Sequence, residues 1–264
     1  SYIFEYNYKD RLIVRMGYMF NYNSAGERMA NNTIKSNSFS IRAGLESAGN
    51  VMYAISNLTK QSKNSDGEYS LLSIPYAQYV KGDFDFSRNI VIDDKNAIAY
   101  HVGVGIAVPY GNSKSIPYIK QYFSGGANSV RGWSVRELGP GSFPGDGNYL
   151  NQSGDIKFDA SIEYRSKLFW LLQGALFVDA GNIWTIKEYE NQPGGQFDIS
   201  KFYKQIAFAY GLGIRIDLDY LVFRIDGGMK ALNPAYSSGK QRYPIINPNF
   251  KRDFTFHLAV GYPF

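Results

Sequence analysis

Apolar and polar side chains alternate along this chain with a period of two, over stretches longer than most soluble sheets need. Between Ile206 and Leu218 every even position is apolar, while the odd positions are small or charged and include Arg215 and Asp217. Neighbouring side chains of a β-strand point to opposite faces, so this stretch presents one hydrocarbon face and one polar face. The alternation therefore predicts a strand whose two sides meet different surroundings.

The same alternation recurs along the whole chain, in segments about as long as the roughly 9–11 tilted residues with which a strand crosses a bilayer. Ten segments lie at about 1–8, 11–23, 36–48, 75–88, 96–110, 155–166, 168–184, 204–218, 220–230 and 253–264. Their connections mostly alternate between short turns and long loops, which is typical of outer-membrane barrels. The sequence predicts an all-β fold, a transmembrane antiparallel up-and-down β-barrel, with a short helical turn near 51–58.

Aromatic residues at the ends of the apolar stripes favour this barrel over a soluble β-sandwich with one solvated face per sheet. Tyrosine and tryptophan gather in this way at the two interfaces of a membrane. The residues concerned are Tyr2, Tyr8, Tyr22, Tyr110, Tyr164, Trp170, Trp184, Tyr220 and Tyr262.

The polar faces combine charged residues with glycine. Burying so many charges in a dry sandwich would be costly unless each were paired, whereas a water-filled lumen removes that cost. Inner-face glycines such as Gly105 and Gly211 leave room for larger side chains. The charged residues assigned to the lumen are Glu5, Arg15, Arg42, Glu46, Lys81, Asp83, Asp85, Lys157, Asp159, Glu163, Arg165, Asp179, Arg215, Asp217, Arg224 and Asp226.

Composition excludes several kinds of site. The chain has no cysteine, so disulfides and thiolate metal sites are excluded. Its two histidines, His101 and His257, lie on different predicted strands without metal-ligand spacing. The net charge of +5 is not gathered in any basic run, so we expect no nucleic-acid partner. We expect neither a cofactor nor a metal ion.

The longest connection, residues 111–154, has the composition of a folded loop. Its dense glycines require special backbone angles or close approach, and apolar residues such as Phe123 are poorly suited to a solvated tip. Its segment Gly125-Gly126-Ala127-Asn128-Ser129-Val130-Arg131-Gly132-Trp133 is similar to the Val-Arg-Gly-aromatic loop tip of the Omp85 superfamily. Further matching segments are Ser161-Ile162-Glu163-Tyr164, Phe177-Val178-Asp179-Ala180-Gly181-Asn182-Ile183-Trp184 and the final Phe264.

The chain thus resembles the C-terminal surface-antigen barrel of that superfamily, of the BamA and TamA type. The resemblance covers essentially the whole chain and implies a barrel of sixteen strands, five of which follow the loop. Residues 1–264 would then be the C-terminal portion of such a barrel, with the long loop at 111–154 folded into the lumen. The first six strands and the periplasmic POTRA domains would then be missing from this chain, and we expect that any export signal has been removed or lies upstream of Ser1.

The loop tip carries a guanidinium group that can bind carboxylates in bidentate fashion. The two strands after the loop carry carboxylates on their polar faces, so a loop folded into the lumen would place the arginine between them. We expect a latch formed by Val130, Arg131, Gly132, Trp133, Glu163 and Asp179. The alternatives are a solvated surface charge, or a latch that serves barrel stability alone.

The last segment ends in an alternating aromatic stripe. It resembles the signal by which outer-membrane proteins are recognised for assembly, although Ala259 stands where that signal has glycine. Proline cannot donate a ladder hydrogen bond, so we expect a weak seam that an incoming strand could join by β-augmentation. The residues of this strand and seam are Phe254, Phe256, Leu258, Tyr262, Pro263 and Phe264.

The resemblance implies two tasks in the bacterial outer membrane: folding and inserting β-barrel proteins, or secreting a partner polypeptide through the pore, as in two-partner secretion. The loop tip favours insertion, without enzymatic activity. The implied partners are unfolded outer-membrane proteins, membrane lipids and lipopolysaccharide, and periplasmic or lipoprotein accessory subunits. Two rivals are a passive porin, which would not need this loop tip, and an omptin-like protease. The protease needs a carboxylate–histidine pair at the outer rim, whereas His101 lies mid-strand and His257 has no evident aspartate partner nearby in the sequence.

Overall fold

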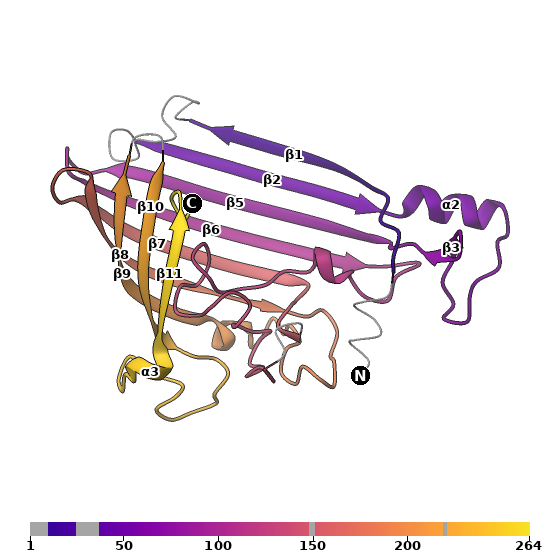
Figure 1. The fold of residues 1–264 in the computed structure, drawn as a ribbon. Helices are drawn as coiled ribbons and strands as arrows, with labels where there is room; N and C mark the ends of the chain where they lie inside the picture. Colours follow the sequence, from indigo (N-terminus) through magenta and orange to yellow (C-terminus); the bar gives the residue numbers. More distant parts are fainter. Residues whose placement is uncertain (1–9, 25–36, 148–150, 219–220) are drawn as a thin grey trace.

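The structure, a computed structural model, describes residues 10–24, 37–147, 151–218 and 221–264, so the predicted strand at 1–8 lies outside the described residues, as do Tyr2, Glu5, Tyr8 and Tyr220. Nine strands form one antiparallel sheet in chain order, which is the predicted up-and-down topology (Figure 1). They are β1 (Arg15–Asn23), β2 (Ser38–Ala48), β5 (Tyr79–Val91), β6 (Asn96–Pro109), β7 (Ile156–Lys167), β8 (Leu172–Trp184), β9 (Ala207–Asp217), β10 (Val222–Leu232) and β11 (Phe254–Val260).

From β2 onward long loops and short turns alternate between these strands, as predicted, whereas the connection between β1 and β2, residues 24–37, departs from this pattern. Since neighbouring strands run in opposite directions, the long loops lie together at one end of the sheet. Their short elements are α2 (Asn50–Leu58), the β3 (Ser70–Leu71) and β4 (Ile74–Pro75) pair, and the helical turns η2 (Tyr118–Lys120), η4 (Phe202–Gln205) and α3 (Phe250–Asp253). The helix α2 confirms the turn predicted near 51–58. Among the described residues, none of the helices has the length and apolar character needed to span a membrane.

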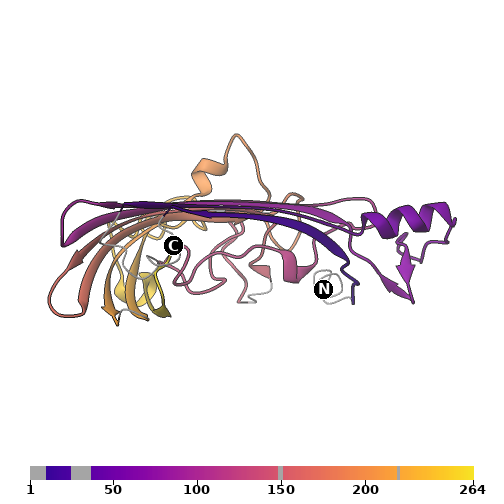
Figure 2. The same cartoon turned by 90° about the horizontal axis from the view of Figure 1, so that it is seen from above.

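The two faces of the sheet show the reverse of the exposure expected for a soluble protein. On β8, Leu176 and Val178 are each 53% exposed, whereas Phe177 between them is 3% exposed and Asp179 is fully buried. Apolar side chains therefore cover the convex face, and charged ones point to the concave face. Figure 2 shows the curvature of the sheet, with residues 110–147 and 151–155 on its concave side. This arrangement matches a barrel wall with lipid outside and a polar lumen inside.

The buried apolar residues lie between the long loop and the concave wall rather than between two sheets. One cluster joins the ascending part of the loop (residues 116–122) to β2, β5, β6 and β8. A second cluster surrounds the loop tip (residues 124–133) on β9. The members of these clusters are Ala48, Ala77, Tyr79, Ala107, Ile116, Tyr122 and Ile183 in the first, and Val130, Trp133, Leu138, Ala207 and Ala209 in the second.

Two expectations about aromatic positions do not hold. The last strand ends at Val260, so Tyr262, Pro263 and Phe264 lie outside the ladder and Pro263 interrupts no strand pairing. The reason is that the chain turns at Gly261, directly after the strand.

Trp184 is 1% exposed rather than interfacial, because the loop after β8 folds over it. Phe197 and Phe202 of that loop lie edge-on to its ring, with centroids at 5.7 and 6.3 Å.

Candidate functional site

The tip of the long loop (residues 124–133) is a tight turn that only glycine permits. Gly125 and Gly126 have φ angles of +94° and +93°, and a Cβ atom on Gly125 would collide with the carbonyl oxygen of Ser134. The turn is closed by the Gly126 amide, which donates to the Trp133 carbonyl oxygen at 2.8 Å. The dense glycines noted in the sequence thus shape a turn that presents the next arginine to the wall.

Arg131 lies between the two predicted carboxylates on the inner wall. Its Nε and Nη2 atoms each donate to Asp179 at 2.8 Å, and its Nη1 atom donates to Glu163 at 2.7 Å. Nη2 also donates to the Ser161 hydroxyl at 3.2 Å, and the guanidinium lies 3.4 Å from the ring centroid of Phe177. Burial lowers the pKa of Arg131, but hydrogen bonds and charges from Asp179 and Glu163 raise it above its usual value, so the guanidinium keeps its proton.

These contacts belong to a larger buried ionic cluster. Glu163 also accepts hydrogen bonds from Arg165 Nε at 2.8 Å and from Arg215 Nη2 at 2.9 Å. Arg215 in turn binds Asp226 at 2.7 Å. Every member is at most 1% exposed, and removing one partner from such a cluster leaves an uncompensated buried charge. The cluster comprises Arg131, Glu163, Arg165, Asp179, Arg215, Arg224 and Asp226.

The loop tip is also bonded to the last strand. Thr255 Oγ1 donates to the carbonyl oxygen of Gly132 at 2.9 Å, and His257 Nε2 donates to that of Arg131 at 2.9 Å. On the neighbouring strand, a Cβ atom at Gly228 would collide with the Arg131 carbonyl. The tip therefore spans the inner wall from β7 to β11. Sequence reasoning missed this half of the site, although Thr255 and His257 alternate with the apolar residues Phe254, Phe256 and Leu258 of the last segment.

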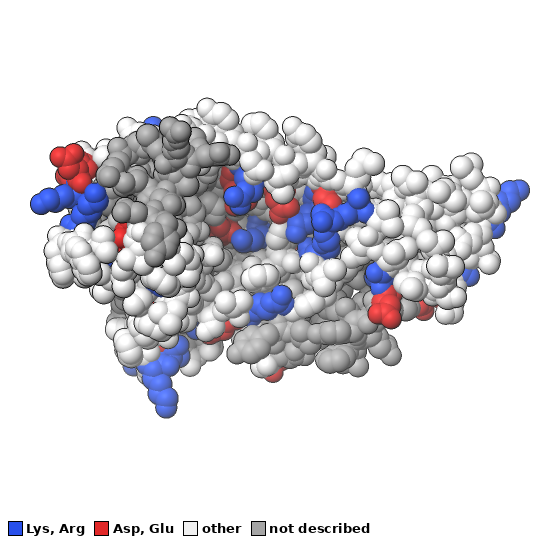
Figure 3. Space-filling view, turned by 45° about the horizontal axis from the view of Figure 1, so that its top comes forward, with Lys and Arg blue, Asp and Glu red and all other residues white. Residues whose placement is uncertain are grey.

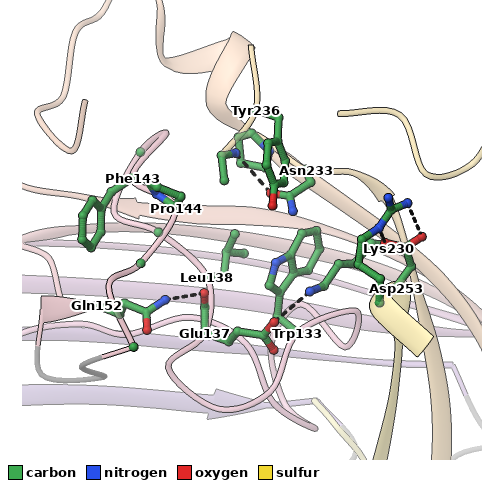
Figure 4. A pocket seen from close by; sticks show the side chains of 17 residues that line it. Trp133, Glu137, Leu138, Phe143, Pro144, Gln152, Lys230, Asn233, Tyr236 and Asp253 are labelled. Atoms are coloured by element: carbon green, nitrogen blue, oxygen red, sulfur yellow. Dashed lines mark hydrogen bonds and ion pairs between the residues drawn. The ribbon is translucent and has the colours of Figure 1, made fainter. Parts of the chain in front are cut away.

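The base of the tip is held by pairs of side chains around a cavity of 340 Å³ (Figure 4). Lys230 Nζ binds Glu137 at 2.8 Å and lies 5.2 Å from the ring centroid of Trp133, which is 2% exposed. Gln152 donates to the Glu137 carbonyl oxygen at 2.5 Å. Asp253 lines the same cavity. Burial raises the pKa of its carboxyl group, but the hydrogen bonds from Arg252 and from the Asn249 amide hold this pKa below its usual value.

A second attachment fixes the ascending part of the loop to the opposite side of the wall. Tyr122 donates to Asp83 Oδ1 at 2.7 Å, and Lys120 Nζ pairs with Glu46 Oε1 at 2.8 Å. A Cβ atom at Gly105 would collide with the Tyr122 ring, which confirms that this inner-face glycine leaves room for a larger side chain. Figure 3 shows charged side chains gathered in the hollow of the molecule. The loop therefore crosses the concave side of the sheet between two attachments.

The residues predicted for the last strand and seam divide into two groups. Phe254, Phe256 and Leu258 lie on the convex face of β11, where Phe256 is 57% and Leu258 70% exposed. Tyr262 and Phe264 turn to the concave side instead. Among the described residues β11 pairs only with β10, and β1 only with β2, so the sheet is open at both edges.

Comparison with known proteins gives a family for this arrangement. The chain is 35% identical over 97 residues to the outer membrane protein assembly factor BamA of Neisseria meningitidis, covering 33% of this chain and 12% of that protein. It is 25% identical over 166 residues to the sorting and assembly machinery component 50 homolog of Mus musculus, covering 57% of this chain and 34% of that protein.

Among solved structures, BamA from Haemophilus ducreyi lacking POTRA domains 1–3 aligns with 94% of this chain and 55% of its own, at 16% identity and a TM-score of 0.48. The chain thus spans at most about a third of the length of these curated relatives. The Omp85 superfamily domain matches residues 1–264, and the chain therefore belongs to the Omp85 superfamily of outer-membrane β-barrel proteins.

Proposed function

We propose that this chain is the C-terminal barrel portion of an assembly factor that folds and inserts other β-barrel proteins into the outer membrane. The observation that carries the proposal is the double attachment of the loop tip, to the ionic cluster on one side and to the edge strand β11 on the other. A strand edge braced from inside can act as a template, because its unpaired backbone groups accept another strand by β-augmentation.

The short length of β11 supports insertion at this edge. It contains 7 residues, whereas its partner β10 contains 11, so any strand on its free side has few ladder hydrogen bonds to make. A short ladder is more easily exchanged for a client strand than a long one. We therefore place the seam at β11, formed by the residues from Phe254 to Val260 rather than by Pro263. No catalytic step is required, since the process exchanges backbone hydrogen bonds.

Secretion through the pore is the alternative, and the loop argues against it. A polypeptide threading the lumen would have to displace a tip whose arginine and two carboxylates are almost completely buried. Breaking such a buried pair costs about 3–5 kcal/mol. Insertion at the edge leaves the cluster intact, so it requires less rearrangement than translocation.

The partners follow from the same reasoning. We propose unfolded outer-membrane proteins as clients, and periplasmic or lipoprotein subunits as accessory factors. Membrane lipids and lipopolysaccharide would surround the convex face, whose exposed apolar residues include Leu176, Val178, Leu212 and Leu258.

The complete protein, reconstituted in lipid vesicles and given a urea-denatured β-barrel client, tests the proposal. We expect the client to become protease-resistant and embedded in the vesicle membrane, faster than in empty vesicles. Recovery of the client as a soluble chain on the far side of the membrane would instead establish secretion and contradict the proposal.

A further inference from the structure

The convex face of the sheet carries a groove near the end where the long loops lie. The groove has a volume of 520 Å³, lies over β5, β6, β7 and β8, and is bordered by the loop that follows β8. We call residues 185–206 the rim loop, and Figure 2 shows this orange segment, with η4, standing on the convex side of the sheet. We call the space between the rim loop and the sheet the outer-face groove.

The floor of the outer-face groove contains a row of paired residues in which one side chain is missing. The row crosses five strands, and its members point to the same face because each is the direct partner of the next; they are Leu45, Gly82, Ile106, Ile156 and Trp184. Four of them carry large apolar side chains, and Gly82 carries none. A Cβ atom at Gly82 would meet nothing within 4 Å, so the glycine leaves open space in an apolar row.

The rim loop forms one wall of the groove and is held in place by hydrogen bonds. The rings of Phe197 and Phe202 line the groove. The Phe197 amide donates to the Thr185 carbonyl oxygen at 2.9 Å, and Trp184 Nε1 donates to Gln205 Oε1 at 2.8 Å. The wall is therefore formed in advance, which lowers the cost of ordering it when a ligand binds.

The groove has the chemistry of a hydrocarbon site. The side chains that line its sheet side are apolar and belong to Phe84, Val104, Ile106 and Phe158. The charged neighbours Asp83 and Lys157 turn their side chains to the concave face, where they bind Tyr122 and Asp159. The backbones of β5, β6 and β7 are paired with one another here, so no strand can add by β-augmentation. A flexible apolar chain fits this groove, whereas an extended polypeptide would bury unpaired amides.

The position of the groove selects the outer leaflet of the membrane. The convex face contacts lipid, and the long loops of outer-membrane barrels are extracellular. On the rim loop, Ile199 is 76% and Tyr203 58% exposed. Lys204 is also exposed, and Arg242 Nη2 donates to its carbonyl oxygen at 3.0 Å, so two cations meet at the rim. Apolar and aromatic side chains beside cations match the boundary between acyl chains and anionic head groups.

We propose that the outer-face groove binds an acyl chain of lipopolysaccharide, with the phosphates of this lipid facing Lys204 and Arg242. The proposal rests on the lipid-facing position of the convex face and not on the proposed function. The chain exchanges one apolar environment for another, so the groove selects it by closer packing rather than by removing it from water. A bound chain would hold the rim loop at the outer leaflet.

Photolabelling of the complete protein in phosphatidylcholine vesicles tests the site. The probe is lipid A, the acylated part of lipopolysaccharide, with a diazirine in one acyl chain, and mass spectrometry locates the label. Bulk lipid would label residues by exposure, which is 70% for Leu258 but 44% for Val104 and 47% for Ile106. We expect about tenfold more label on Val104 and Ile106 than on Leu258, which corresponds to about 1.4 kcal/mol. Labelling in the order of exposure overturns the proposal.

Two glycines of the convex face provide a matched pair of variants. Gly82→Phe places a ring in the open space of the groove. Gly174→Phe places the same ring beyond the groove, on β8, where a Cβ atom would make only an ordinary contact of 3.5 Å with Leu168. We expect Gly82→Phe to lower the labelling of the groove about tenfold and Gly174→Phe to leave it unchanged. Equal labelling of the groove in the two variants contradicts the assigned site.

A second probe tests the identity of the lipid. Phosphatidylethanolamine with the same photoreactive chain is zwitterionic, so we expect it to label the groove less than lipid A does. Lys204→Gln should lower labelling by lipid A about fivefold, the effect of one lysine beside an anionic membrane surface. Equal labelling by the two probes overturns the assignment to lipopolysaccharide.

Client insertion in the same vesicles separates this proposal from the proposed function. Insertion should be unchanged in Gly82→Phe protein, because the groove lies on β5 to β8 and the seam on β11. Labelling in the order of exposure with insertion intact overturns the groove and leaves the function standing. Insertion lost in Gly82→Phe but not in Gly174→Phe protein would show that the groove receives the client, which overturns its assignment to a lipid.

Discussion

The long loop is fixed to the barrel wall twice, and the two attachments differ chiefly in their access to water. At the tip, the side chains of Arg131, Glu163 and Asp179 are at most 1% exposed. At the ascending part, those of Lys120 and Glu46 are 17% and 15% exposed. Charges in a dry cluster depend strictly on their partners, whereas water can replace a partner at the wetter attachment. The attachment at the tip therefore fixes the loop to the wall, whereas the attachment at the ascending part can change its partners.

The largest expected effect comes from Glu163→Gln, which removes the carboxylate shared by three arginines. We expect a loss of about 3–5 kcal/mol in the free energy of unfolding, because buried guanidinium groups lose their counter-charge. The matched change at the wetter attachment, Glu46→Gln, should cost about 1 kcal/mol or less. Urea unfolding of the complete protein measures both, and equal losses would remove the distinction between the attachments.

A smaller loss is expected from Gly228→Ala, which places a methyl group against the backbone of the loop tip. Forcing an atom into such a contact typically costs about 1–3 kcal/mol. Gly82→Ala is the matched control, since a Cβ atom there meets nothing within 4 Å, and it should change stability by no more than about 0.5 kcal/mol. If both variants unfold at the same urea concentration, the tip does not contact β10 as described.

Thr255→Val removes one bond between the tip and the edge strand, with an expected cost of about 1 kcal/mol. The effect should be local. Hydrogen exchange should accelerate at the amides of β11 and stay unchanged at those of β8. Uniform acceleration along the sheet would show that the bond does not brace the edge in particular.

The smallest effect is expected from Tyr122→Phe, which removes the hydroxyl bound to Asp83. The Tyr122 ring is buried, but Asp83 is only half-buried, so water can replace the lost hydroxyl at the carboxylate. We therefore expect a loss of about 0.5 kcal/mol, at the low end for a hydrogen bond. A loss as large as that of Glu163→Gln would place the fixed point of the loop at its ascending part.

The fold was predictable because the alternation of apolar and polar side chains is a local property of each strand. It can be recognised in the sequence wherever one face of the strand is apolar. Arg131 lies with Glu163 and Asp179 as the motif suggested, but the bonds that Arg224, Thr255 and His257 make to the loop tip were not foreseen. Their partners in the tip are Asn128, Gly132 and Arg131 respectively. Those contacts depend on the curvature of the sheet and on how far the loop reaches, which alternation does not encode. The turn at Gly261 was missed for a similar reason, since a single backbone angle redirects an aromatic stripe that otherwise continues.

The most direct test of the fixed loop tip is a double-mutant cycle between Arg131→Met and Asp179→Asn, read from urea unfolding of the complete protein. The contacts at 2.8 Å predict strong coupling, with the double variant less destabilised than the sum of the single variants by about 2–3 kcal/mol. Additive losses would mean that the guanidinium does not bind this carboxylate, and the account of a loop anchored on the inner wall would be contradicted.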